Sequence, residues 1–185
     1  MVVNDANGRA MKVKPGGFAN VVAINEPLFH ACVKGGIGWS LGGVITAADA
    51  ADHVIFYLEN TSDVDLEIHG IFLSSAIAGL MVIETGRIYA SGGVAKSINQ
   101  FRTDSGKIQS VLAYMSNGIT LTGTATEVIW KRVPADNLLD MMGEEGVMIL
   151  APQTKMAIRF DADSGTPQIA LTMMIHGEEP WEYED

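Results

Sequence analysis

Apolar and polar residues alternate in short runs along this chain, and residues with turn-forming side chains separate the runs. Residues 53–73 show the pattern most clearly, with apolar, β-branched and aromatic runs on both sides of Asn60-Thr61-Ser62-Asp63. This segment predicts one β-hairpin. Comparable runs predict strands at 18–24, 39–46, 53–59, 66–74, 80–84, 94–101, 119–133 with a break, 147–151, 155–161 and 168–176. Short strands with frequent turns predict a β-sandwich or barrel.

The side chains within a predicted strand alternate between its two faces. Alternation places Val54, Phe56 and Leu58 on one face, and His53, Ile55, Tyr57 and Glu59 on the other. The second face is therefore not polar. Ile71 and Leu73 are likewise apolar side chains at positions expected on an outer face. We therefore expect a second sheet, a loop or a neighbouring subunit to cover it.

Helical patterns are short and rare. Residues 47–52 are rich in alanine, and residues 137–142 begin with Asn137, a residue that caps helices, before Gly143 ends the pattern. Each predicts at most a single helical turn. The expected fold class is therefore all-β, with minor helical turns.

The two ends of the chain differ in composition from its middle. Residues 1–17 show no sustained period and end in Pro15-Gly16-Gly17, which predicts an extended arm. Residues 18–177 are expected to form one β domain, and residues 178–185 form an acidic tail. Arg9, Lys12 and Lys14 make the arm basic, and either they are solvated or they dock on an acidic neighbour.

The amino-acid composition and charge limit the kinds of partner that the chain is expected to bind. The chain is 48% hydrophobic and only 18% charged, so part of its apolar surface is expected to meet another subunit. Its formal net charge of −10 argues against binding nucleic acid. The sequence has no apolar run of the roughly 18 residues that span a membrane and no signal-like start, so we expect no membrane contact and a cytoplasmic protein until assembly. Cys32 is the only cysteine and fits a small buried hydrophobe.

Candidate chemical motifs fail on spacing. Asp161-Ala-Asp163-Ser-Gly165 lacks the glycine and glutamate positions of a calcium loop, and Gly35-Gly-Ile-Gly38 lacks the ending of a phosphate loop. His30, His53, His69 and His176 have no zinc-like spacing, so the fold alone would have to assemble a zinc site. Glu59 and Glu67 would form a glycosidase-like pair only if they faced each other across the predicted hairpin. We expect no catalytic residue, cofactor or metal site.

The three tryptophans offer another kind of site. Trp130 lies in an apolar run and is interpreted as a core residue, whereas Trp181 lies in the acidic tail. Trp181 is a candidate for subunit contact, with packing on its own domain and ligand stacking as the alternatives. Trp39 and Trp181 are the candidates for stacking on a sugar ring.

The order of segments resembles a family of tailed-phage virion proteins in which a jelly-roll sandwich decorates or cements the capsid. The segments that carry the resemblance are Pro27-Leu-Phe-His30, Gly38-Trp-Ser40, His53 to Ser62, Leu66-Glu-Ile-His69, Ala95-Lys-Ser-Ile-Asn99 with Arg102, Ser105-Gly106, Leu121-Thr-Gly-Thr124, Gly146 to Pro152 and Lys155-Met-Ala-Ile158. They cover roughly residues 27–177, and they are strand and turn patterns without catalytic signatures.

The resemblance implies a jelly-roll-like antiparallel β-sandwich, often a homotrimer, on the outer surface of a phage head. Its partners would be copies of itself and the major capsid protein, and it would act by binding without catalysis. The candidate contact residues are Arg9, Lys12, Lys14 and Trp181. The alternative is a carbohydrate-binding or host-recognition module of a phage fibre, spike or tail.

Overall fold

The structure of the chain is a computed structural model, and it describes residues 3–4, 10–11, 37–45, 53–101, 110–142 and 148–177. Every regular element in these ranges is a β-strand. The described part of the chain accordingly holds no helix that is long and apolar enough to cross a bilayer.

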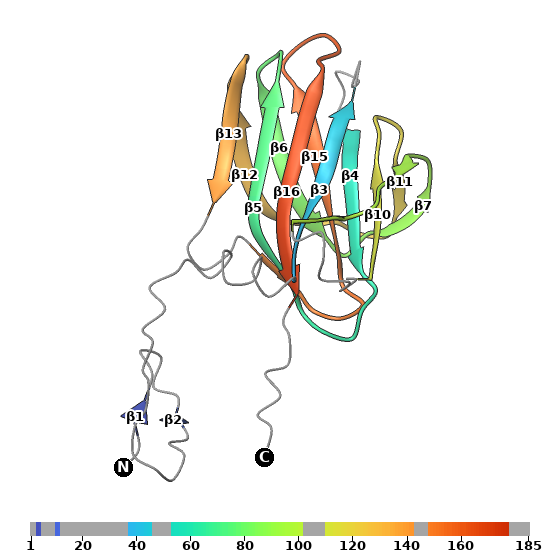
Figure 1. The fold of residues 1–185 in the computed structure, drawn as a ribbon. Coiled ribbons are helices and arrows are strands. Elements are labelled where there is room, and N and C mark those ends of the chain that lie inside the picture. Colours follow the sequence, from blue (N-terminus) through green and yellow to red (C-terminus); the bar gives the residue numbers. More distant parts are fainter. Residues whose placement is uncertain are drawn as a thin grey trace.

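Two six-stranded antiparallel sheets pack face to face across these residues (Figure 1). The front sheet has the order β13 (Asn137–Met142), β5 (Leu66–Ser75), β16 (Ile169–Gly177), β3 (Gly38–Ile45) and β9 (Asn99–Gln100), and β14 (Met148–Leu150) also pairs with β5. The back sheet has the order β12 (Thr126–Val133), β6 (Gly79–Thr85), β15 (Lys155–Ala162), β4 (His53–Asn60), β10 (Val111–Met115) and β8 (Val94–Ala95). Two small sheets pair β7 (Ile88–Ser91) with β11 (Thr120–Thr122), and β1 (Val3–Asn4) with β2 (Ala10–Met11).

The long strands alternate between the two sheets along the chain. β3 and β5 lie in the front sheet while β4 and β6 lie in the back sheet, and the later strands β12, β13, β15 and β16 alternate in the same way. Four strands of each sheet thus follow the winding of a jelly roll, in which pairing partners are distant in sequence. The expectation of an all-β, jelly-roll-like sandwich is confirmed.

The core lies between the sheets and consists of side chains from both inner faces. The back sheet contributes residues such as Phe56, Leu58, Ile83, Ile158 and Phe160, and the front sheet contributes residues such as Leu41, Ile71, Leu73, Leu171 and Met173. All of these are almost fully buried. Their alternation along each strand leaves the other side chains on the outer faces of the sandwich.

The predicted hairpin at residues 53–73 is wrong. Both strands exist, but β4 pairs with β15 and β10, whereas β5 pairs with β16, β13 and β14. The chain crosses from one sheet to the other at buried Asn60, whose amide donates hydrogen bonds to the carbonyls of Val64 (2.8 Å) and Leu150 (2.9 Å). Two apolar strands around a turn can face each other across a core as readily as they can pair.

Strict alternation also fails in β4, because the strand contains a β-bulge. Ile158 pairs with Phe56 and Arg159 pairs with Val54, which leaves Ile55 as an extra residue. Ile55 therefore joins Phe56 and Leu58 in the core, while Val54 lies with Tyr57 in a second cluster outside the back sheet. The prediction had placed Val54 with Phe56.

Other elements also differ from prediction. Residues 137–142, predicted to form a helical turn, form strand β13, in which Leu139 and Met141 pack against the core at every second position. The run 94–101 is divided between β8 in the back sheet and β9 in the front sheet. β7 and β10 were not predicted, because their short runs lie among turn residues.

Some predictions fall on residues outside the described ranges. These are the strand at 18–24, the turn at 47–52, the tail 178–185 and the environment of Cys32. Of the predicted arm, 1–17, the structure describes only β1 and β2, which pair antiparallel.

Candidate functional site

The outer side of the front sheet is the candidate interaction surface, and we call it the open face. Apart from Glu67, His69 and His176 at one end of the sheet, it carries the outward side chains of β3, β5, β13 and β16, which are Ser40, Val44, Phe72, Ser74, Leu138, Asp140, Ala170, Thr172 and Met174. Each is partly or fully exposed, and Val44 and Leu138 both reach 55% exposure. None of these described positions is Lys or Arg, and Asp140 is the only charged one.

The register explains why this face has little charge. Leu138 lies opposite Ser74, Ser74 opposite Ala170, and Ala170 opposite Val44, so small and apolar side chains form a row across four strands. Phe72 and Met174 lie in the neighbouring rows. An uncharged sheet face with small and apolar side chains loses little favourable hydration when another protein covers it.

Part of the outer side of the back sheet, over β4 and β15, is covered by the chain itself. A flap made of β7, β11 and Ile119 packs on Val54, Tyr57 and Ala157. Tyr89 of the flap stacks on Tyr114 with ring centroids 4.0 Å apart and the planes 1° from parallel. Burial raises the pKa of Tyr57, and its hydroxyl donates to Glu59 Oε2 at 2.7 Å. The apolar outer residues of β4 are therefore explained within one chain.

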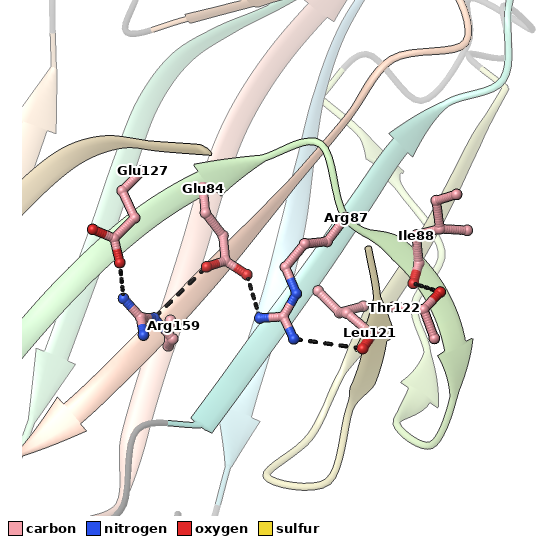
Figure 2. Close-up of polar contacts among 7 residues, drawn as sticks. All are labelled: Glu84, Arg87, Ile88, Leu121, Thr122, Glu127 and Arg159. Carbon is pink, nitrogen blue, oxygen red and sulfur yellow. Dashed lines mark hydrogen bonds and ion pairs between the residues drawn. The ribbon is translucent and has the colours of Figure 1, made fainter. Parts of the chain in front are cut away.

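A chain of alternating charges fixes this flap to the sheet (Figure 2). Glu84 is the buried member, with a side chain only 1% exposed, and it lies between Arg87 (3.0 Å) and Arg159 (3.7 Å). Arg159 also pairs with Glu127 on β12. Arg87 donates to the carbonyl of Leu121 in β11 at 3.4 Å, so the charge chain runs from the sheet edge to the flap. Two carboxylates and two guanidinium groups balance, which makes this a structural network.

An apolar edge borders the back sheet. Val128 and Trp130 on β12 are 46% and 54% exposed, and Ile149 on β14 is 61% exposed. Val128 and Ile149 line a groove of about 480 Å³ together with Met148 and Leu150. The prediction that Trp130 is a core residue is wrong: a bulge in β12 between Glu127 and Ile129 lets Ile129 reach the core, and Trp130 points outward.

A cluster of three potential metal ligands lies at one end of the front sheet. His176 on β16 lies opposite Glu67 on β5, with 3.3 Å between Nε2 and Oε2. His69 lies beside them, its ring centroid 6.2 Å from that of His176. Burial and the neighbouring His176 lower the pKa of His69, which Glu67 partly opposes. The sequence spacing of these residues concealed the cluster, because β5 and β16 are distant in the chain.

The structure does not test the residues predicted as contacts. Arg9, Lys12, Lys14 and Trp181 are outside the described ranges, so their predicted role in capsid or subunit contact stays a prediction. Trp39 is 2% exposed and cannot stack on a sugar.

The fold also shows how the Glu59 and Glu67 pair and the acidic segment at 161–165 are arranged. Glu59 and Glu67 lie in different sheets, so they do not form a glycosidase-like pair. In the proposed turn at 161–165, Asp163 pairs with Arg132 and Gly165 has a φ of 63°. This is ordinary turn chemistry, as predicted.

Comparison with known proteins gave no match among family models, curated proteins or solved structures. The function must therefore be inferred from the surfaces described above.

Proposed function

We propose that this chain is a virion structural protein of the capsid decoration or cement kind, which binds the outside of a phage head and stabilises contacts between capsid subunits. It acts by binding, without catalysis, and its partners are copies of itself, as a homo-oligomer and most simply a trimer, and the major capsid protein. The observation that carries the proposal is the open face, a four-stranded surface without Lys or Arg at its described outward positions.

The contrast between the two faces of the sandwich supports this role. On the outer side of the back sheet, the flap and the charge chain cover part of the surface. The front sheet, in contrast, leaves Val44 and Leu138 more than half exposed. A protein that binds an assembled state and not its separated parts stabilises that state by mass action. The open face supplies apolar area for such binding, and the apolar edge at Trp130 supplies a second contact.

Binding to capsids tests the proposal. The protein is mixed with capsids assembled from the major capsid protein of the same genome, and bound protein is measured by sedimentation. We expect saturable binding and capsids that open at a higher temperature than undecorated ones. Capsids that neither bind the protein nor gain heat resistance would refute the proposal.

Two charged variants locate the binding surface. Leu138→Asp introduces a carboxylate into the open face, and Ile88→Asp introduces one at a similarly exposed position on the flap, where Ile88 is 52% exposed. Burying an unpaired charge costs several kcal/mol, so Leu138→Asp should weaken capsid binding by about 100-fold or more. Ile88→Asp should bind like the wild type. Equal binding of both variants would show that the open face does not bind the capsid.

A second candidate is recognition of a host glycan, and exposed Trp130 is the observation that favours it. An indole that is 54% exposed on a sheet edge is a possible stacking surface for a sugar ring. A glycan array distinguishes the candidates, with Trp130→Ala as the test and Val128→Ala as the control. Specific, saturable sugar binding that disappears only in Trp130→Ala would replace the cement proposal.

A further inference from the structure

Two imidazoles and a carboxylate converge where β5 and β16 pair. The core residues of β5 are Leu66, Ile68, Ile71 and Leu73, so their spacing is two, three and two residues. The irregular step is a β-bulge, since Met174 pairs with Gly70 and Ile175 pairs with Ile68. The extra residue is His69.

The bulge places His69 on the same side of the sheet as Glu67. Regular alternation puts Glu67 outward between Leu66 and Ile68, and His176 lies directly opposite it. His69, the residue with no register partner on β16, lies beside this pair. Among the described residues, this is the one group of at least three His, Cys, Asp or Glu side chains whose ligand atoms lie together.

The distances suit a metal ion after small side-chain rotations. One ligand atom from each residue lies within 4.8 Å of the others, and the pair His176 Nε2 and Glu67 Oε2 is at 3.3 Å. Zinc bonds of about 2.0–2.2 Å place neighbouring ligand atoms about 3–3.5 Å apart around a tetrahedral ion. One pair already has this separation, and the third ligand needs to move by about an ångström.

The three potential ligands are largely shielded from solvent. His176 is 3% exposed and His69 is 6% exposed, while the Glu67 side chain is 14% exposed and offers the route from solvent. A contact with Glu67 alone would need only one imidazole. The second imidazole, which the bulge adds to the same side, gives the group three potential ligands.

We propose that Glu67, His69 and His176 bind one divalent transition-metal ion, with zinc as the ion that best fits two imidazoles and one carboxylate. The ion joins β5 to β16, and three protein ligands leave a fourth coordination position for water or an external ligand. The site lies at one end of the same outer side of the front sheet as the open face, but it does not depend on the proposed role in a capsid.

Zinc binding by the full-length chain tests this inference. The purified protein is stripped with a chelator and titrated with zinc sulfate, and affinity is measured by competition with a chromophoric chelator. We expect one zinc ion per chain and a melting temperature that rises with zinc concentration. Absence of stoichiometric zinc binding would overturn the inference.

Conservative variants assign the ligands. Glu67→Gln and His176→Gln keep the size of the side chain, and each should lower zinc affinity by more than the about 10- to 100-fold that loss of an outer-shell partner costs. His53→Gln, a histidine change on β4 away from the cluster, is the matched control and should bind as the wild type does.

The zinc titration still tests the ligands if one of the variants is unstable. Glu67 is the most accessible ligand, so Glu67→Gln should fold, and circular dichroism of the stripped protein verifies this. His30 and Cys32 are present in every variant, so binding through them would persist in Glu67→Gln. Wild-type zinc affinity in folded Glu67→Gln would therefore overturn the inference, whichever residues bind the metal.

Discussion

At the scale of single residues, the most sensitive position is the carboxylate of Glu84. It is 1% exposed and depends on two guanidinium groups, Arg87 and Arg159, which are themselves 26% and 19% exposed. A buried charge that loses a partner is costly, whereas removal of both members of a pair costs much less. The charge chain should therefore show strong coupling between its members.

Substitution of Arg159 tests this coupling. Arg159→Gln leaves Glu84 with one partner and should lower the free energy of unfolding by about 3 kcal/mol. The double variant Glu84→Gln/Arg159→Gln removes the buried charge as well and should recover part of that loss. Urea unfolding at neutral pH measures both values.

The control lies at the rim of the same network. The Glu127 side chain is 38% exposed, so Glu127→Gln should change the free energy of unfolding by less than about 1 kcal/mol. A double variant at least as unstable as Arg159→Gln alone would show that Glu84 is not held by these charges.

At the scale of elements, β3 and β16 leave no room for a side chain at Gly42. A Cβ atom added to Gly42 would overlap the carbonyl oxygen of Leu171, which is backbone and cannot move aside. A Cβ atom added to neighbouring Gly43 would meet the end of the Lys96 side chain at 3.0 Å. The two adjacent glycines therefore have different requirements.

Alanine substitutions separate these two glycines. Gly42→Ala should separate β3 from β16 and lower the melting temperature by roughly 6–12 °C, on the order of a loss of 3 kcal/mol. Gly43→Ala should leave the melting temperature within about 3 °C of the wild type, because Lys96 can swing away. Thermal unfolding followed by circular dichroism gives both values, and equal shifts would contradict the structure.

The sequence predicted strands far better than it predicted their partners. The runs at 39–46, 53–59, 66–74, 80–84, 155–161 and 168–176 correspond to β3, β4, β5, β6, β15 and β16. Apolar alternation identifies a strand with a buried face, but it does not say whether the next strand lies beside it or across the core. The false hairpin at 53–73 arose from this ambiguity.

The bulges set a second limit on prediction from sequence. One extra residue at Ile55, Val128 and His69 reverses the face of the residues that follow, and no local residue pattern announces it. Trp130 became exposed and His69 joined Glu67 for this reason. The candidate metal site also needed the pairing of β5 with β16, which is a property of the whole fold.

At the scale of the whole molecule, the two outer faces of the sandwich differ in kind. The back sheet carries charges and its own flap, whereas the open face carries small, apolar and uncharged side chains with Asp140 as the exception. The high hydrophobic fraction of the sequence, 48%, predicted surplus apolar surface. It could not locate that surface, because both sheets are built from similar strands.

We propose that the molecule works by adhesion of the open face to a capsid, and a reconstruction of capsids incubated with the protein is the sharpest test. We expect sandwich-shaped density on the outer surface of the shell, with β13, β5, β16 and β3 turned toward a capsid subunit or another copy of the chain. Bare shells, or bound protein whose open face is turned to solvent, would contradict it.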